Sequence, residues 1–187
     1  RKKPNSEKRI VIVYYKSPGM AALSAGGLEV APALWNTLQR LQSEGYDLGG
    51  PLPESPDALF ALIQARGKTL GQWALGAFET FLKEADPELV PATRYADWFQ
   101  QALSPKRQQE TINLWGELPG ETMVTSVDGQ PHLVISRIQL GNIVIMPQPT
   151  VGGGGETEDE ISSIHGTDQA APHFYLGAYL WARYGFQ

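Results

Sequence analysis

The sequence of 187 residues contains no cysteine. This absence excludes disulfide bonds, thiolate metal sites and cysteine nucleophiles, and it leaves the redox compartment open. Long apolar runs are also absent, since none approaches the roughly 20 residues that a membrane-spanning helix needs. Arg1–Arg9 lacks the apolar stretch of a signal peptide. We therefore expect a soluble chain without a membrane span.

Charged side chains are scarce, at 19% of the residues, and the net charge is -5. Residues 1–10 carry five basic side chains against Glu7 alone, so the rest of the chain is more acidic than the net charge suggests. An acidic body argues against nucleic-acid binding. We interpret residues 1–9 as a solvated linker cut from a longer chain, in preference to a phosphate-binding arm.

The apolar pattern predicts an α/β fold. Ile10–Tyr15 is a short β-branched and aromatic run, typical of a strand buried on both faces of a parallel sheet. A second such run covers Asn142–Met146, and helical spacing of apolar residues lies between them from Leu34 to Leu41. We expect a Rossmann-like layered domain over residues 10–187, with a central, partly parallel sheet.

The middle of the chain has two distinct patterns. Residues 55–116 show helical spacing, with Ser55-Pro56 and Ser104-Pro105 as helix starts, and we expect this section to be helical throughout. Within residues 121–168, Asp128-Gly129 separates two strand-like runs and suits the positive φ angles of a tight hairpin. This second section is therefore expected to hold a β-hairpin followed by a loop region.

The segment between Pro147 and His173 holds most of the residues that could carry chemistry. Four consecutive glycines cost folding entropy, which a sequence tolerates where backbone approaches a ligand closely or moves. The pattern is neither a phosphate loop nor a dinucleotide fingerprint, and a plain flexible loop is the competing interpretation. The glycines are Gly152, Gly153, Gly154 and Gly155.

Acids and histidines follow these glycines. Carboxylates and imidazoles could bind a divalent cation or move protons, although their spacing alone specifies no site and a solvated acidic turn remains the alternative. These side chains are Glu156, Glu158, Asp159, Glu160, His165, Asp168 and His173. The third histidine, His132, lies beside the hairpin turn, and we expect it to be structural or exposed.

Two further groups are weighed against simpler explanations. Glu117 and Glu121 bracket a turn after a helix, where exposed acids are the simpler interpretation. Four aromatic residues near the end of the chain could stack against a flat macrocycle, but they equally fit a helical core. These are Tyr175, Tyr179, Trp181 and Tyr184.

Several segments, in order, resemble the large, tetrapyrrole-binding subunit of the metal chelatases, the family that includes the large subunits of cobalt chelatase and of magnesium chelatase. They span nearly the whole chain. The segments are IVIVYYKSPG, LEVAPALWNTLQRLQSEGYDLG, WGELPGETM, GNIVIMPQP and HGTDQAAPHFYLGAYLWARYGF. A second His-Gly-Thr-His-Gly-like motif would follow Gln187, so we expect the chain to be an internal piece that is inactive by itself.

This resemblance implies insertion of a divalent metal ion, cobalt or magnesium, into a porphyrin or corrin ring. Removal of the pyrrole protons requires a base beside the ring. By resemblance Glu156 is the first candidate, with Glu121, His165 and His173 as further bases. His165, Asp168 and His173 are candidate metal contacts, and Gln148 with the four glycines would contact the ring.

The resemblance also implies partners and a compartment. The remainder of the parent subunit would complete the site, and AAA+ ATPase motor subunits would be the only users of ATP. The cytoplasm is the family default. Thr150-Val151 leads into four glycines, a pattern that resembles a haem-associated branch, for which removal of metal from haem and a periplasmic parent are implied. A non-catalytic tetrapyrrole-binding module is the third hypothesis.

Overall fold

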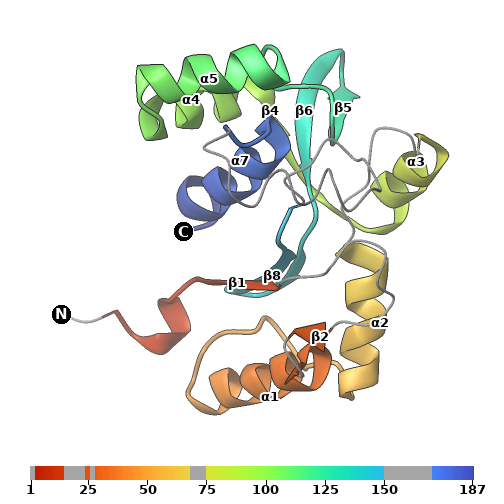
Figure 1. Cartoon of the computed structure of the whole chain (residues 1–187). Helices are drawn as coiled ribbons and strands as arrows, with labels where there is room; N and C mark the ends of the chain where they lie inside the picture. The colour runs from red at the N-terminus through yellow and green to blue at the C-terminus, as the bar shows by residue number, and fades with distance from the viewer. Residues whose placement is uncertain (1–2, 15–23, 26–27, 68–74, 150–169) are drawn as a thin grey trace. The chain divides into compact units, whose positions relative to one another are not determined.

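The computed structural model describes residues 3–14, 24–25, 28–67, 75–149 and 170–187 (Figure 1). The chain divides into two compact units. Unit 1 comprises Arg1–Lys68 and Ser136–Gln148, and unit 2 comprises Thr69–Ile135 and Pro149–Gln187. The single domain that we expected over residues 10–187 stays a prediction.

Unit 1 is built on a three-stranded sheet in the order β1-β8-β7. β1 (Ile10–Tyr14) runs parallel to the central strand β8 (Ile143–Pro147), and β7 (Ile138–Leu140) is antiparallel to it. Every residue of β8 is buried, as its uninterrupted apolar run predicts. The expected α/β class and partly parallel sheet are therefore confirmed.

Two helices of unit 1 pack their apolar residues against this sheet. α1 (Val30–Ser43) contributes Leu34 and Leu38, and α2 (Pro56–Arg66) contributes Leu59 and Ile63 to the cluster that includes Ile143 and Ile145. Unit 1 also contains the short 3-10 helix η1 (Asn5–Glu7) and a pair of two-residue strands, β2 (Ser24–Ala25) and β3 (Leu28–Glu29). Burial of this apolar cluster is the main stabilising contribution to unit 1.

The boundaries of α2 follow from its end residues. Ser55 accepts a hydrogen bond from the backbone N–H of Ala58 at 3.1 Å, and Pro56 occupies the first helical position. At the other end, the Tyr14 hydroxyl donates to the carbonyl oxygen of Gly67 at 3.1 Å. This buried bond ties β1 to the end of α2.

The turn between β7 and β8 lies directly against the loop that follows α1. The N–H of Asn142 donates to the carbonyl oxygen of Asp47 at 2.9 Å, and the Asp47 carboxylate accepts from the N–H of Gly49 at 2.8 Å. Gly49 has φ +71°, and a Cβ there would lie 2.8 Å from the backbone nitrogen of Gly141. Only a residue without a side chain permits this approach.

Unit 2 contains an antiparallel sheet in the order β4-β6-β5. Its strands are β4 (Glu88–Pro91), β5 (Val124–Val127) and β6 (Gln130–Ile135). The hairpin between β5 and β6 turns at Asp128 and Gly129, with φ of 51° and 76°. This is the hairpin that the Asp-Gly pair predicted.

The described part of unit 2 also contains five helical segments. They are α3 (Leu75–Glu84), α4 (Ala92–Ala102), α5 (Pro105–Trp115), α7 (His173–Leu180) and η2 (Trp181–Phe186), a π-helical turn that continues α7. α4 and α7 both pack against β6 and against each other. Among the described residues, no helix is long and apolar enough to cross a membrane.

The expectation that residues 55–116 are helical throughout is wrong at β4. Glu88–Pro91 forms an edge strand that pairs with β6, where Val90 is buried and Leu89 is 39% exposed. Only four residues form this strand, and Pro91 also precedes α4, so the local sequence offers too little alternation to oppose a helical interpretation. Pairing with β6, which is distant in sequence, decides the conformation.

The close approach of Gly49 to Gly141 can be tested with alanine substitutions. Gly45 provides the matched control, because it has φ +80° but no atom within 4 Å of the point where a Cβ would lie. Gly45→Ala should lower the free energy of unfolding by about 1 kcal/mol, the cost of a left-handed alanine. Gly49→Ala should lower it by about 2 to 4 kcal/mol, since backbone overlap is added. Urea titrations followed by circular dichroism measure both losses, and equal losses would contradict the proposed contact.

Candidate functional site

The described residues include three of the candidate site residues, namely Gln148, Glu121 and His173. The others lie outside the described residues, so their roles stay predictions. These are Gly152, Gly153, Gly154, Gly155, Glu156, His165 and Asp168. The described candidates belong to both units, Gln148 to unit 1 and the other two to unit 2, and each is considered within its own unit.

Gln148 extends the parallel pairing of β1 and β8 by one residue. Its N–H donates to the carbonyl oxygen of Tyr14 at 2.8 Å, directly after the buried Pro147. The side chain of Gln148 is half-buried. The sheet therefore fixes the backbone of Gln148, while a contact with a ring stays a prediction.

Glu121 lies on the connection from α5 to β5 and is exposed, as is Glu117. Two glycines shape this connection: Gly116 has φ +81° and Gly120 has φ +79°, and the N–H of Gly120 donates to the carbonyl oxygen of Glu117 at 2.7 Å. Positive φ at both positions turns the chain sharply at low cost. The carboxylate of Glu121 is thus held at the surface of unit 2.

His173, the first residue of α7, is 2% exposed and has both ring nitrogens engaged. Nε2 lies 2.8 Å from the carbonyl oxygen of Gly116, and Nδ1 lies 2.8 Å from the Tyr95 hydroxyl. A carbonyl oxygen can only accept, so Nε2 carries the proton, and in the neutral ring Nδ1 accepts from Tyr95. The hydrogen bonds therefore define one tautomer of a neutral imidazole.

The surroundings of His173 favour that neutral form. Burial lowers the pKa of His173, and the hydrogen bond to Gly116 and the charge of Glu117 oppose this shift without reversing it. Burial also raises the pKa of Tyr95, so its hydroxyl remains a donor. For His173 to accept a proton during catalysis, Nδ1 would first have to lose the hydrogen bond that it accepts from the Tyr95 hydroxyl.

Aromatic rings and a glycine enclose the imidazole. The ring centroids of Tyr95 and Phe99, both on α4, lie 5.8 Å and 5.7 Å from that of His173. A Cβ on Gly120 would lie 3.1 Å from Cδ2 of His173. This enclosure joins α4, the α5–β5 connection and the start of α7 around one side chain.

Three of the four aromatic residues near the end of the chain can be compared by their environments. Trp181 is buried and packs on Phe186, with ring centroids 5.7 Å apart, so the helical-core interpretation is confirmed for it. Tyr175 and Tyr179 are half-buried and lie 5.0 Å apart on successive turns of α7. Burial, followed by the effect of Tyr175, raises the pKa of Tyr179 to about 12. The hydroxyl of Tyr179 is therefore neutral near pH 7.

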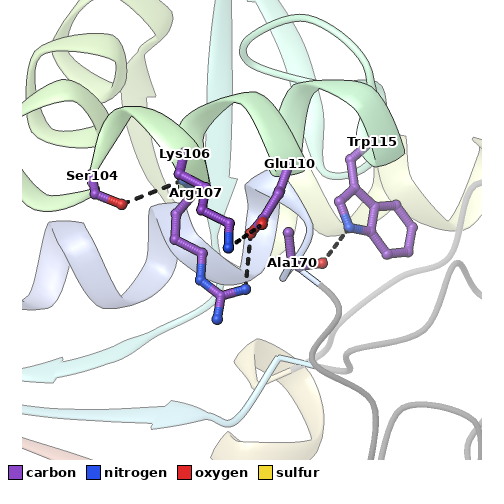
Figure 2. A network of polar contacts seen from close by, with 6 residues as sticks. All are labelled: Ser104, Lys106, Arg107, Glu110, Trp115 and Ala170. Atoms are coloured by element: carbon purple, nitrogen blue, oxygen red, sulfur yellow. Dashed lines mark hydrogen bonds and ion pairs between the residues drawn. The ribbon is translucent and has the colours of Figure 1, made fainter.

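Trp115 makes a contact that the sequence did not predict. Its indole N–H donates to the carbonyl oxygen of Ala170 at 2.6 Å (Figure 2). The only local signal was a tryptophan directly before a helix-ending glycine. The partner lies 55 residues further along the chain, and no local pattern identifies such a partner.

The described part of the chain contains no group of three or more histidine, aspartate and glutamate side chains that could hold a metal ion. Of the candidate metal contacts, only His173 lies in this part, and His165 and Asp168 lie outside it. Oxygen and imidazole donors of this kind fit a divalent metal ion. Because His165 and Asp168 lie outside the described residues, a metal site made of His165, Asp168 and His173 stays a prediction.

Comparison with known proteins gives the following matches. A family model described as CobN/Magnesium Chelatase matches residues 1–187. The chain is similar to a magnesium-chelatase subunit from Chlorobaculum parvum, with 27% identity over 179 residues that cover 95% of this chain and 12% of the relative. Its identity to aerobic cobaltochelatase subunit CobN of Pseudomonas aeruginosa is 25% over 192 residues, covering 100% of this chain and 14% of the relative.

A solved structure shares the fold. The catalytic subunit of cobaltochelatase from Mycobacterium tuberculosis matches with a TM-score of 0.72 and 30% identity, over 99% of this chain and 14% of that protein. The chain thus spans only 12% to 14% of the length of these relatives.

The buried neutral state of His173 predicts a pH dependence of stability. In the unfolded chain His173 binds a proton near its ordinary pKa of about 6.5, whereas the folded chain resists protonation to a lower pH. The unfolded state then binds more protons in this window, so the free energy of unfolding should fall as the pH decreases below about 6.5. Urea midpoints measured between pH 5 and pH 8 report this loss.

Two glutamine variants separate His173 from other titrating groups. His173→Gln should weaken the pH dependence of the urea midpoint, because the titrating ring is removed. His132→Gln should retain it, since the ring of His132 on β6 is only half-buried and its hydrogen bond to the carbonyl oxygen of Gln130 is exposed. An unchanged pH dependence in His173→Gln would show that another group is responsible.

Proposed function

This chain belongs to the CobN/magnesium chelatase family, and from that premise we propose that its parent protein is a tetrapyrrole metal chelatase. The observation that carries this proposal is the match along all 187 residues, supported by the similarity to a cobaltochelatase catalytic subunit at a TM-score of 0.72. The chain would form part of the tetrapyrrole-binding catalytic subunit.

The proposed reaction inserts a divalent ion, cobalt or magnesium, into a porphyrin or corrin ring. The ion becomes bound to the four ring nitrogens, and in a porphyrin two of these nitrogens lose their N–H protons, which pass to bases beside the ring. No electron is transferred. The required groups are therefore proton acceptors and transient metal contacts.

Glu156 is the first proposed proton acceptor, and Glu121 is its partner. His165 and His173 are further bases, and His165 with Asp168 and His173 would contact the incoming metal. Gln148 and Gly152–Gly155 would contact the ring, because glycine permits close approach of the backbone to a flat surface.

The exposure of Glu121 and the burial of His173 make the two described side chains unequal as candidate bases. The Glu121 carboxylate is exposed and can exchange protons with solvent or substrate directly. His173 is buried in its neutral form, and its only basic nitrogen already accepts from Tyr95. We therefore place His173 behind the carboxylates as a base.

The parent would act with the remainder of its own large subunit and with AAA+ ATPase motor subunits, which alone would use ATP. A cytoplasmic location is part of the proposal. The four glycines after Thr150-Val151 favour metal removal from haem as the second candidate function. Removal is the same exchange in reverse, so the same site would serve.

The proposal can be tested with Glu156→Gln in the full-length parent, together with its motor subunits and ATP. Loss of a general base should lower kcat by about 100-fold or more, while the dissociation constant for the ring stays within about twofold. Glu158→Gln is the matched control, since it removes one carboxylate from the same acidic run. Absorbance and metal analysis of the ring, with cobalt, magnesium or haem supplied, identify the metal and the direction of exchange.

Three results would change the proposal in different ways. Unchanged turnover in Glu156→Gln would remove Glu156 from the mechanism. Ring binding by the wild-type parent without metal exchange in either direction would favour a non-catalytic binding module. Removal of iron from haem, with no insertion, would establish the second candidate function in place of the first.

A further inference from the structure

We propose that the outer edge of β1 is an interaction surface, which binds an extended, apolar strand from a part of the parent protein outside residues 1–187. This strand would join the sheet of unit 1 beside β1, through main-chain hydrogen bonds. The inference rests on the proposed function only in assuming a parent as long as the chelatase relatives. It requires no metal exchange.

The backbone of β1 bonds to a neighbouring strand on one side. β1 pairs in parallel with β8, and the N–H of Ile10 donates to the carbonyl oxygen of Asn142 at 2.9 Å. In a parallel pair, alternate residues direct their N–H and C=O groups to the same neighbour. Val11 and Val13 therefore direct theirs to the opposite edge of β1. Among the described residues, no strand pairs with that edge.

The side chains of β1 are less buried than those of β8, although both strands are apolar runs. Every residue of β8 is buried, whereas Tyr14 alone is buried in β1. Val13 is 38% exposed, while Met146, its partner in the register, is 1% exposed. Paired residues share one face of the sheet, so the exposure begins at β1. A run of this composition is typical of an interior strand, which indicates that the complete sheet continues beyond β1.

The other outer strands of the two three-stranded sheets carry features that protect an edge. Proline, polar side chains and short length all discourage pairing with a further strand. β4 contains the exposed Pro91, β5 contains the exposed Ser126, and β7 has only three residues, including the exposed Gln139. β1 has five residues, without proline, glycine or charge. Its edge therefore has the composition of one that is covered.

The occupant that we propose is a strand of the same polypeptide. The chain spans only 12% to 14% of the length of the chelatase relatives, so most of a parent of that length lies outside residues 1–187. A segment of the same polypeptide has a high effective concentration near β1. Pairing within one polypeptide also covers the edge permanently, and an unprotected apolar edge otherwise favours aggregation.

Hydrogen exchange in the full-length parent, resolved to single residues by mass spectrometry, tests the pairing. The amide of Ile12 faces β8 and serves as the internal reference. Beneath a covering strand, the amides of Val11 and Val13 should exchange as slowly as that of Ile12, to within about tenfold. On an open edge they should exchange roughly 100-fold faster, because no partner protects them. Slow exchange at Ile12 with fast exchange at Val11 and Val13 would overturn the proposal.

The 187-residue chain provides the control for a cover formed within these residues. In this chain we expect slow exchange at Ile12 and fast exchange at Val11 and Val13, because the covering strand is missing. Slow exchange at all three amides would show that residues of the chain itself cover the edge. That result would overturn the proposal.

Cross-linking in the parent identifies the occupant and does not depend on whether the shorter chain folds. Val13→p-benzoylphenylalanine places a photoreactive group beside the proposed strand, and we expect a cross-link to a segment outside residues 1–187 of the same polypeptide. Gln139→p-benzoylphenylalanine is the control, since Gln139 is exposed on β7, the opposite outer strand of this sheet. Equal cross-linking from both positions would contradict a cover specific to β1.

The results also separate this inference from its alternatives and from the proposed function. A cross-linked species of twice the parent's mass would show a second copy on the edge and would overturn the chosen occupant. A cross-link from position 13 that stays within residues 1–187 would do the same. A parent that exchanges no metal would refute the proposed function, whereas the hydrogen-exchange and cross-linking results would still decide whether a strand covers β1.

Discussion

The imidazole of His173 can be buried only if both of its ring nitrogens have partners, and this requirement organises unit 2. A buried polar group without a partner costs about 1 to 3 kcal/mol. Here the partners are Tyr95 on α4 and the carbonyl oxygen of Gly116 at the end of α5. One side chain therefore sets α7 against two other helices, and the absence of a side chain at Gly120 leaves room for it.

If the parent is the proposed chelatase, this arrangement would give the described part of unit 2 a supporting function. The end of α5 determines the positions of two groups. The glycine turn leads from it to the exposed carboxylate of Glu121, and hydrogen bonds connect it to Ala170 and to His173 at the start of α7. Chemistry that depends on proton acceptors near a flat ring needs fixed positions for those acceptors. Rigid hydrogen-bonded helix ends provide such positions more readily than exposed loops do.

Local sequence was sufficient for some elements and insufficient for others. The positions of strands β1 and β8, the Ser-Pro start of α2 and the Asp-Gly hairpin all follow from patterns within a few residues. The expectation that the first strand is buried on both faces is wrong, because only Tyr14 of β1 is buried and Val13 is 38% exposed. β4 was missed because its conformation depends on pairing with β6, and the bond of Trp115 because its partner is distant. His173 was identified as a candidate from its residue type, but its burial depends on Tyr95 and Phe99, which lie far away in sequence.

The division of unit 1 into two stretches of sequence has a consequence for biosynthesis. β1 emerges from the ribosome long before β8, its parallel neighbour, because all of Thr69–Ile135 is translated between them. Until then the apolar run of β1 has no strand beside it from this sheet, and such edges favour aggregation. The sheet of unit 1 therefore cannot be completed until β8 has been translated, and this non-local pairing is of the kind that slows folding.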